Sequence, residues 1–188
     1  AAENELEFAN GIDPMQIEKY FKYFQAATGV DNQGKYSVTL PMITTEDLRI
    51  ANIGATPDLD LLGRLNVKYI VSAYEYPLDG LVEVDSIDEV WVYRNSFYRP
   101  RVWIQKSAAE SLNYWQVTID SYTPGEIIVT TDRDGVVVFS EIAYPCWRVF
   151  VDDVQRPMLE VHGVVPAVEV DGGQHRVMLQ FTPRGLLP

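Results

Sequence analysis

The chain has 188 residues, of which 47% are apolar and 12% aromatic, and its formal net charge is −12. This composition excludes a disordered chain, and the acidic balance argues against binding to nucleic acid or to anionic lipid through charge. No apolar run approaches the about 20 residues that a membrane-spanning helix requires. A single cysteine, Cys146, excludes an internal disulfide.

The first predicted element is an amphipathic helix over residues 14–28. Asp13 is placed to cap it, Pro14 suits its first position, and Gly29 is a natural stop. Four apolar residues recur at the spacing of one helix face, which indicates a helix packed on a core rather than a ligand site. They are Ile17, Tyr20, Phe21 and Phe24.

A second, shorter helix and three strands follow. Thr56 is the expected cap and Pro57 the first residue of this helix, whose leucines recur at helical spacing up to Leu65. Val67–Ser72 has the pattern of a buried strand, and residues 81–95 that of two strands joined by a turn near Asp85–Asp88. These elements predict a small α/β layer over residues 1–96.

From residue 97 onward, strand patterns recur at short intervals and helical spacing fades. The links between them, such as "TPGE" and "DGGQH", have turn chemistry. Such punctuation is typical of an antiparallel sandwich. The fold class is therefore α+β: an α/β subdomain, 1–96, packed with a β-sandwich subdomain of about seven strands, 97–188. The seven expected strands cover residues 101–105, 115–122, 125–131, 135–144, 147–153, 164–170 and 175–181.

The sequence predicts no catalytic residue, metal ligand set or cofactor. His162, His175 and Cys146 lack zinc spacing, and no nucleophile or phosphate-binding motif occurs. Two Asp-x-Asp pairs fit structural roles. Asp58 with Asp60 lies at a helix start, and Asp132 with Asp134 fits a hairpin turn. Calcium at Asp132 and Asp134 stays open.

The stretch "YPCWRVFVD", residues 144–152, has the strongest candidates for ligand binding: Tyr144, Trp147 and Asp152. We interpret it as a corner, because Pro145 interrupts strand pairing and the two rings on either side can pack around the turn. The functional alternative is a platform on which the same rings stack against a sugar.

Several motifs, in order, resemble the C-terminal extracytoplasmic region of the YfhO family of bacterial membrane proteins. The family shows "LLNVKY", "N-x-x-x-x-PR", "YPGW" followed by "VDG", and a late "G-x-H-x-V-x-F-x-Y-x-P". The matching segments are Leu65–Tyr69, Asn95–Arg101, Tyr144–Trp147, Val151–Asp153 and Gly173–Pro183. Cys146 and Asp153 replace two glycines of this pattern.

The resemblance implies a polytopic glycosyltransferase of the GT-C type that uses lipid-linked sugars outside the cytoplasmic membrane. This chain would be its non-catalytic soluble domain, covering the membrane active site or positioning an acceptor glycan or polymer. Its partners would be the transmembrane helices of its own full-length chain, and a glycan or lipid-linked sugar.

Two other classes of function stay open. A carbohydrate-binding module would expose two or three coplanar rings among its four tryptophans. A soluble hydrolase would use dispersed carboxylates that meet in the fold. The tryptophans are Trp91, Trp103, Trp115 and Trp147.

Overall fold

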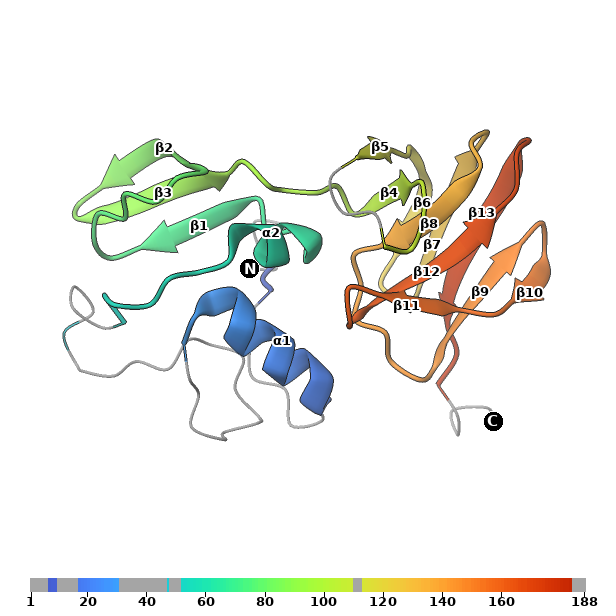
Figure 1. The fold of residues 1–188 in the computed structure, drawn as a ribbon, viewed down its shortest axis with the longest axis horizontal. Helices are drawn as coiled ribbons and strands as arrows, with labels where there is room; N and C mark the ends of the chain where they lie inside the picture. The colour runs from blue at the N-terminus through green and yellow to red at the C-terminus, as the bar shows by residue number, and fades with distance from the viewer. Residues whose placement is uncertain (1–6, 10–16, 31–46, 48–51, 110–112, 184–188) are drawn as a thin grey trace. The chain divides into compact units, whose positions relative to one another are not determined.

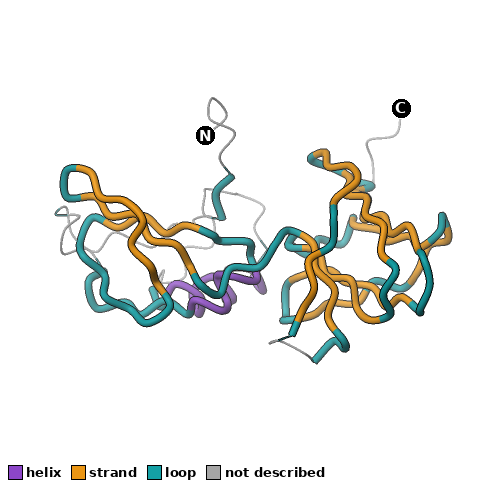
Figure 2. Tube along the Cα trace, turned by 90° about the horizontal axis from the view of Figure 1, so that it is seen from above, coloured by secondary structure: helices purple, strands orange, loops and turns teal. Residues whose placement is uncertain are grey.

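The structure is a computed structural model that describes residues 7–9, 17–30, 47, 52–109 and 113–183. The chain divides into two units, residues 1–99 and 100–188. Within the described residues the fold is α+β, as predicted, with two short helices and thirteen strands in three antiparallel sheets. The helices belong to the first unit, and the second is built from strands (Figures 1 and 2).

The first unit pairs two helices with one face of a three-stranded antiparallel sheet (Figure 1). Its strands lie in the order β1-β3-β2, so β1 and β2 are both edges. The elements are α1 (Glu18–Thr28), α2 (Leu59–Arg64), β1 (Tyr69–Ser72), β2 (Leu81–Ile87) and β3 (Val90–Asn95).

Helix α1 begins at Glu18, one turn later than predicted, because the preceding Ile17 has extended backbone angles. The expected cap, Asp13, and Pro14 lie outside the described residues. Phe21 and Phe24 are buried, as their spacing predicts. The helix ends at Gly29, as predicted, which has a φ of 69°. A Cβ at this glycine would lie 2.6 Å from the Thr56 carbonyl oxygen, so glycine is required here on both counts.

Helix α2 is capped by Asp58 and not by Thr56. The Asp58 carboxylate accepts hydrogen bonds from the backbone N–H groups of Asp60 and Leu61, each at 3.0 Å. Thr56 lies too far upstream for this role, because the first helical residue is Leu59.

The expectation that Val67–Ser72 forms a buried strand was wrong. Strand β1 is an edge strand in which Tyr69 is 52% and Val71 66% exposed. Only Ile70 packs toward the helices, because they cover one face of the sheet. The predicted hairpin between β2 and β3 is present, with its tip at Asp88 and Glu89, where both φ angles are positive.

The second unit contains ten strands in two five-stranded antiparallel sheets, with orders β10-β9-β13-β7-β6 and β11-β12-β8-β4-β5. Each of the seven predicted segments contains strand structure. Residues 115–122, expected as one strand, instead contribute to two strands in different sheets, β5 and β6, and β10 and β11 were not predicted. The strands are β4 (Val102–Gln105), β5 (Tyr114–Gln116), β6 (Ile119–Thr123), β7 (Glu126–Thr131), β8 (Gly135–Phe139), β9 (Trp147–Val151), β10 (Val154–Arg156), β11 (Leu159–Val161), β12 (Val165–Val170) and β13 (His175–Phe181).

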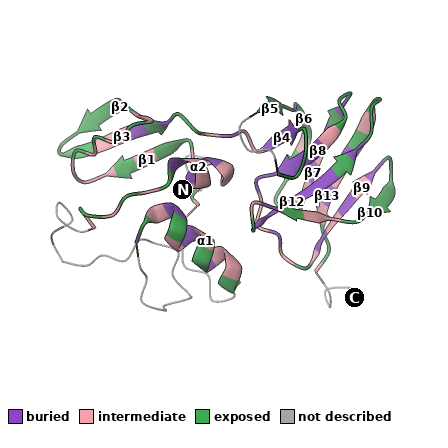
Figure 3. Ribbon diagram, viewed as in Figure 1, coloured by how far each residue is buried: buried purple, intermediate pink, exposed green. Residues whose placement is uncertain are grey.

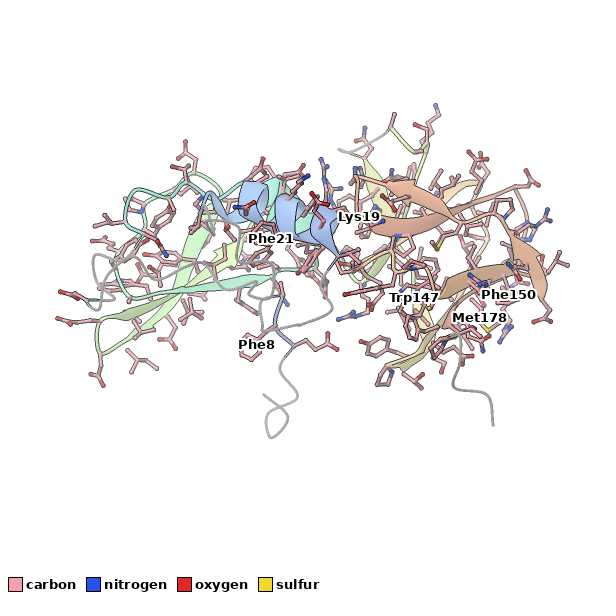
Figure 4. The ribbon with its side chains drawn as sticks, turned by 90° about the horizontal axis from the view of Figure 1, so that it is seen from below. Phe8, Lys19, Phe21, Trp147, Phe150 and Met178 are labelled. Atoms are coloured by element: carbon pink, nitrogen blue, oxygen red, sulfur yellow. The ribbon has the colours of Figure 1, made fainter. Side chains whose placement is uncertain are left out.

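The core of the second unit lies between its two sheets (Figure 3). In β13, alternate residues point into it, as the sequence pattern predicts: Val177 and Leu179 are fully buried, whereas Arg176 is exposed. Phe139 and Ile104 of one sheet meet this layer from the other side. Figure 4 labels Trp147 beside Phe150 and Met178, which pair across β9 and β13. By strand alternation, that pair lies on the outer face of the sheet.

Candidate functional site

The corner at Tyr144–Trp147 is a tight turn. The Trp147 N–H donates to the Tyr144 carbonyl at 3.1 Å, and Pro145 holds the second position, where proline is favoured. Cys146 does not have a positive φ, so this position does not require glycine. Its carbonyl accepts a hydrogen bond from the Thr182 N–H at 2.8 Å, which fixes the corner to the end of β13.

The rings of this corner pack. Trp147 is only 7% exposed and meets Phe181 edge-on, with ring centroids 5.0 Å apart. Tyr144 packs against the same core while remaining partly exposed. Trp103 is fully buried, so neither Trp103 nor Trp147 can present a ring face to a sugar. Trp115 is exposed, but the Arg133 guanidinium lies over its ring at 5.2 Å.

Asp152 lies at the opposite end of β9 from Tyr144 and Trp147. Asp152 is five residues along the strand from Trp147, which is about 16 Å at ~3.3 Å per residue. The Asp152 carboxylate binds His175 Nδ1 at 2.7 Å and accepts from the Arg176 N–H at 2.9 Å. The hydrogen bond from His175 holds the pKa of Asp152 below its ordinary value. The structure therefore does not bring the three predicted ligand residues into one site.

The β9–β10 hairpin turn consists of Asp152 and Asp153, whose φ angles are 51° and 63°. Asp153 thus has the left-handed conformation that glycine favours, at the position where the family pattern has glycine. Its carboxylate accepts from Arg176 Nη1 at 3.0 Å. A carboxylate at this turn therefore gains a partner that glycine could not bind.

The end of the sandwich that contains the corner has further polar and aromatic groups. Arg101 Nη1 binds the Glu141 carboxylate at 2.8 Å, and the Arg101 guanidinium lies over the Tyr122 ring at 4.8 Å. Burial raises the pKa of Glu141, although the Arg101 charge opposes that shift. We call this region the sandwich end. It comprises Arg101, Tyr122, Glu141, Tyr144, Trp147 and Phe181.

The sandwich end combines partly exposed rings with hydrogen-bonding groups. Phe181 is 37% exposed, and Tyr122 is 44% exposed with the Arg101 guanidinium over one face of its ring. The Arg101–Glu141 pair adds hydrogen-bond donors and acceptors. Sequence reasoning missed Arg101 and Glu141, which are 40 residues apart and share no motif. Arg101 does close the "N-x-x-x-x-PR" element, and that is the one signal that could have identified it.

The two Asp-x-Asp pairs have separate structures. Asp60 binds Arg64 and Arg99, so this carboxylate has structural partners, as does the capping carboxylate of Asp58. Asp132 and Asp134 are exposed. Their segment joins β7 of one sheet to β8 of the other, so the expected hairpin is absent, because each strand pairs with other neighbours.

His162 has a φ of 52° in the turn between β11 and β12, and His175 begins β13, where their sequence contexts place them. Within the described ranges, His, Cys, Asp and Glu side chains form no group of three or more able to hold a metal ion. In the same part of the chain, neither helix has the length and apolar character needed to cross a bilayer.

No protein-family model matches the chain, and no curated protein or solved structure matches it either.

Proposed function

We propose that this chain is the non-catalytic extracytoplasmic domain of a polytopic, glycosyltransferase-like membrane protein, and that its sandwich end positions an acceptor glycan. The order of the YfhO-like motifs supports this proposal. The domain would lie at the outer face of the bacterial cytoplasmic membrane, beside the transmembrane helices of its own full-length chain. The chemistry of transfer would belong to those helices.

One observation carries the proposal: motifs that are distant in sequence bind each other in space. In the first unit, Asn95 is 2% exposed, and its side-chain amide donates to the carbonyls of Leu59 and Val67 at 2.9 and 3.2 Å. The Asn66 amide donates in turn to the Arg99 carbonyl at 2.7 Å. The "LNVKY" and "N-x-x-x-x-PR" segments therefore hold one another in place.

The motifs of the second unit pair in the same way. Trp147–Val151 and Val177–Phe181 lie side by side as β9 and β13. The carboxylate of Asp152 binds His175 beyond one end of this pair, and Cys146 binds Thr182 beyond the other. Residues that a family shares for such contacts maintain a fold. This supports a domain that presents or covers a substrate and does not itself transform it.

The first test is the location of the domain in the full-length protein. Val154 is 56% exposed, so a Val154→Cys variant in a Cys146→Ser background carries one accessible thiol in this chain. Any cysteine in the remaining protein is replaced as well. A membrane-impermeant maleimide should label this thiol in intact spheroplasts. Labelling only after permeabilisation places the domain inside the cell and refutes the proposal.

The second test is the role of the sandwich end in glycan transfer. Loss of a hydrogen bond to a charged group costs about 1.5–3 kcal/mol, so Arg101→Ala should raise the acceptor KM about tenfold or more and leave kcat unchanged. Arg133→Ala is the matched control, because Arg133 also lies over an exposed ring but at the other end of the sandwich. Equal kinetics for both variants would remove the sandwich end from the acceptor site.

A further inference from the structure

Aspartate followed by glycine is one of the sequences at which a protein backbone can rearrange without an enzyme. The glycine nitrogen can attack the aspartate carboxyl carbon, because no side chain shields that nitrogen. The dipeptide alone does not distinguish one such pair from another, so a difference in their reactivity reflects the fold. The pairs in the described part of the chain are Asp79–Gly80, Asp134–Gly135 and Asp171–Gly172.

Packing and hydrogen bonding hold Gly80 in place. A Cβ at this glycine would lie 2.5 Å from the Phe97 ring, so that side chain encloses the backbone. The Gly80 carbonyl also accepts a hydrogen bond from the Ser96 N–H at 2.9 Å. Turning the Gly80 nitrogen toward the Asp79 carboxyl would disrupt these contacts. This pair can therefore react only when its segment opens locally.

Sheet pairing holds Gly135, the first residue of β8. It pairs in register with Val170 of β12, and a Cβ at Gly135 would lie 2.5 Å from the Gln105 carbonyl oxygen of β4. Rotation of the peptide between Asp134 and Gly135 would pull this end of β8 out of the sheet. Local opening is required here as well.

The Asp171–Gly172 pair has neither constraint. Residues 171–174, which link β12 to β13, are all exposed, and a Cβ at Gly172 would meet nothing within 4 Å. Throughout the part of the chain that the structure describes, no hydrogen bond holds the Gly172 N–H or the Asp171 carboxylate. The nitrogen and the carboxyl carbon can therefore approach each other while the rest of the fold stays intact.

We propose that Asp171 is a site of spontaneous conversion to isoaspartate in the folded protein. The Gly172 nitrogen forms a bond to Cγ of Asp171, and the carboxyl hydroxyl leaves with the N–H proton as water, which gives a cyclic succinimide. Water then adds to either ring carbonyl. Opening at Cγ restores aspartate, whereas opening at the main-chain carbonyl carbon routes the backbone through Cβ and Cγ. The overall change is an isomerisation, so it needs no oxidant, reductant or reactant other than water.

The fold can accept isoaspartate at this position. The product adds a methylene group to the backbone between β12 and β13, and the exposed link can absorb the extra length. Val170 and His175, which flank the link, then keep their pairing with β8 and β7. The result is a folded protein with an exposed isoaspartyl carboxylate, the substrate class of methyltransferases that use S-adenosylmethionine to begin repair. This inference does not depend on the proposed function, because it needs no glycan and no membrane.

The test compares the three pairs within one molecule. The 188-residue chain is kept in neutral buffer below its unfolding temperature and sampled over several weeks. Peptide mapping by mass spectrometry with electron-transfer fragmentation distinguishes isoaspartate from aspartate. Isoaspartate should form at Asp171 at least about tenfold faster than at Asp79 or Asp134, because those two pairs require local opening. In water labelled with heavy oxygen, the Asp171 product should carry the label, which identifies the succinimide route.

Two further measurements separate the effect of the fold from that of local sequence. In concentrated urea, the three pairs should react at rates within about threefold of one another. Gly172→Ala should slow the reaction at Asp171 about tenfold by shielding the nitrogen, and it should fold, because its Cβ meets open space and its φ is not positive. Gly54→Ala, whose Cβ also meets nothing within 4 Å, is the matched control and should leave the rate unchanged.

Four results would overturn the proposal. The folded chain forms no isoaspartate at Asp171, although the chain in urea does. Asp79 or Asp134 reacts as fast as Asp171 in the folded chain. The ranking of the folded chain persists in urea, which would assign the selectivity to local sequence. Gly172→Ala reacts at the wild-type rate, which would exclude attack by the Gly172 nitrogen.

Discussion

Replacing Trp147 by alanine should separate a packing role from a binding role. A tryptophan side chain buries about 200 Å², which at about 25 cal/mol per Å² corresponds to about 5 kcal/mol. The alanine methyl group retains a small part of this burial free energy, so Trp147→Ala should lower the free energy of unfolding by about 4 kcal/mol. This agrees with the ~3–5 kcal/mol observed when large aromatics are removed from protein cores. The 7% exposure of Trp147 means that nearly the full loss applies.

The contact between Trp147 and Phe181 contributes a coupling energy that can be measured separately. The two rings meet edge-on at 5.0 Å, and such pairs contribute about 0.5–1.5 kcal/mol beyond burial. A double-mutant cycle with Phe181→Ala should therefore return a coupling energy of about 1 kcal/mol. Because the chain has two units, urea unfolding should be followed by amide exchange in β9 and β13, which report the second unit alone.

With an m-value of about 1–3 kcal/mol per M, a loss of 4 kcal/mol moves the urea midpoint by about 1–4 M. Trp147→Phe, which keeps most of the apolar area, should cost about 1–2 kcal/mol and provides a measurable variant where alanine prevents folding. A folded Trp147→Ala protein that loses less than about 1 kcal/mol would refute the packing role. The ring would then be available to a ligand.

Three further changes test other contacts. Asp58→Ala should cost about 1 kcal/mol, because it removes the carboxylate that caps α2, and thermal unfolding measures the loss. Gly63→Ala should destabilise the first unit by several times that amount, since a Cβ there would lie 2.1 Å from the Phe97 carbonyl oxygen. Asp152→Asn should lower the free energy of unfolding at pH 7. The folded state depresses the pKa of Asp152 below 3.8, its ordinary value. The difference between the two proteins should therefore shrink as the pH falls below 3.8 and vanish once the carboxylate is protonated in the folded state as well. Urea midpoints at pH 2–7 give this profile.

Each of these changes has a control or a contrary result. Gly54→Ala is the matched control for Gly63→Ala, because a Cβ at Gly54 meets nothing within 4 Å. For α2, an Asp58→Ala variant that unfolds at the wild-type temperature would contradict the role of Asp58. For the β9–β10 hairpin, a wild-type stability advantage over Asp152→Asn that persists at pH 2 would show that the charge of the Asp152 carboxylate is not what stabilises the turn.

The sandwich could be predicted because its strands alternate cleanly. Val177 and Leu179 follow one another at period two between turn signals, and this spacing is a property of the local sequence. Strand β10 escaped prediction because all of its residues, Val154–Arg156, are exposed and show no alternation. The division of residues 115–122 into two strands was not predicted either. Their local pattern indicates one strand, whereas the crossing of the chain from one sheet to the other depends on the distant strands with which β5 and β6 pair.

The exposure of β1 and the set of residues that form the sandwich end could not be predicted, for a related reason. Val71 has the apolar character of a core residue, but it is 66% exposed, because the described helices pack against the other face of the sheet. Arg101 and Glu141 become neighbours only once β4 and β8 have paired. Local patterns report what a segment can bury. They do not report whether the fold supplies a partner.

The bulge in β2 limits how copies of this chain can associate. The pairing of β2 with β3 shifts between Glu83 and Asp85, so this open edge offers neither regular spacing nor an uncharged border to an incoming strand. The other edge, β1, is four residues long. Growth of the sheet by strand addition has no natural stopping point and leads to fibres. Because neither edge favours such addition, concentrated solutions of the chain should remain clear.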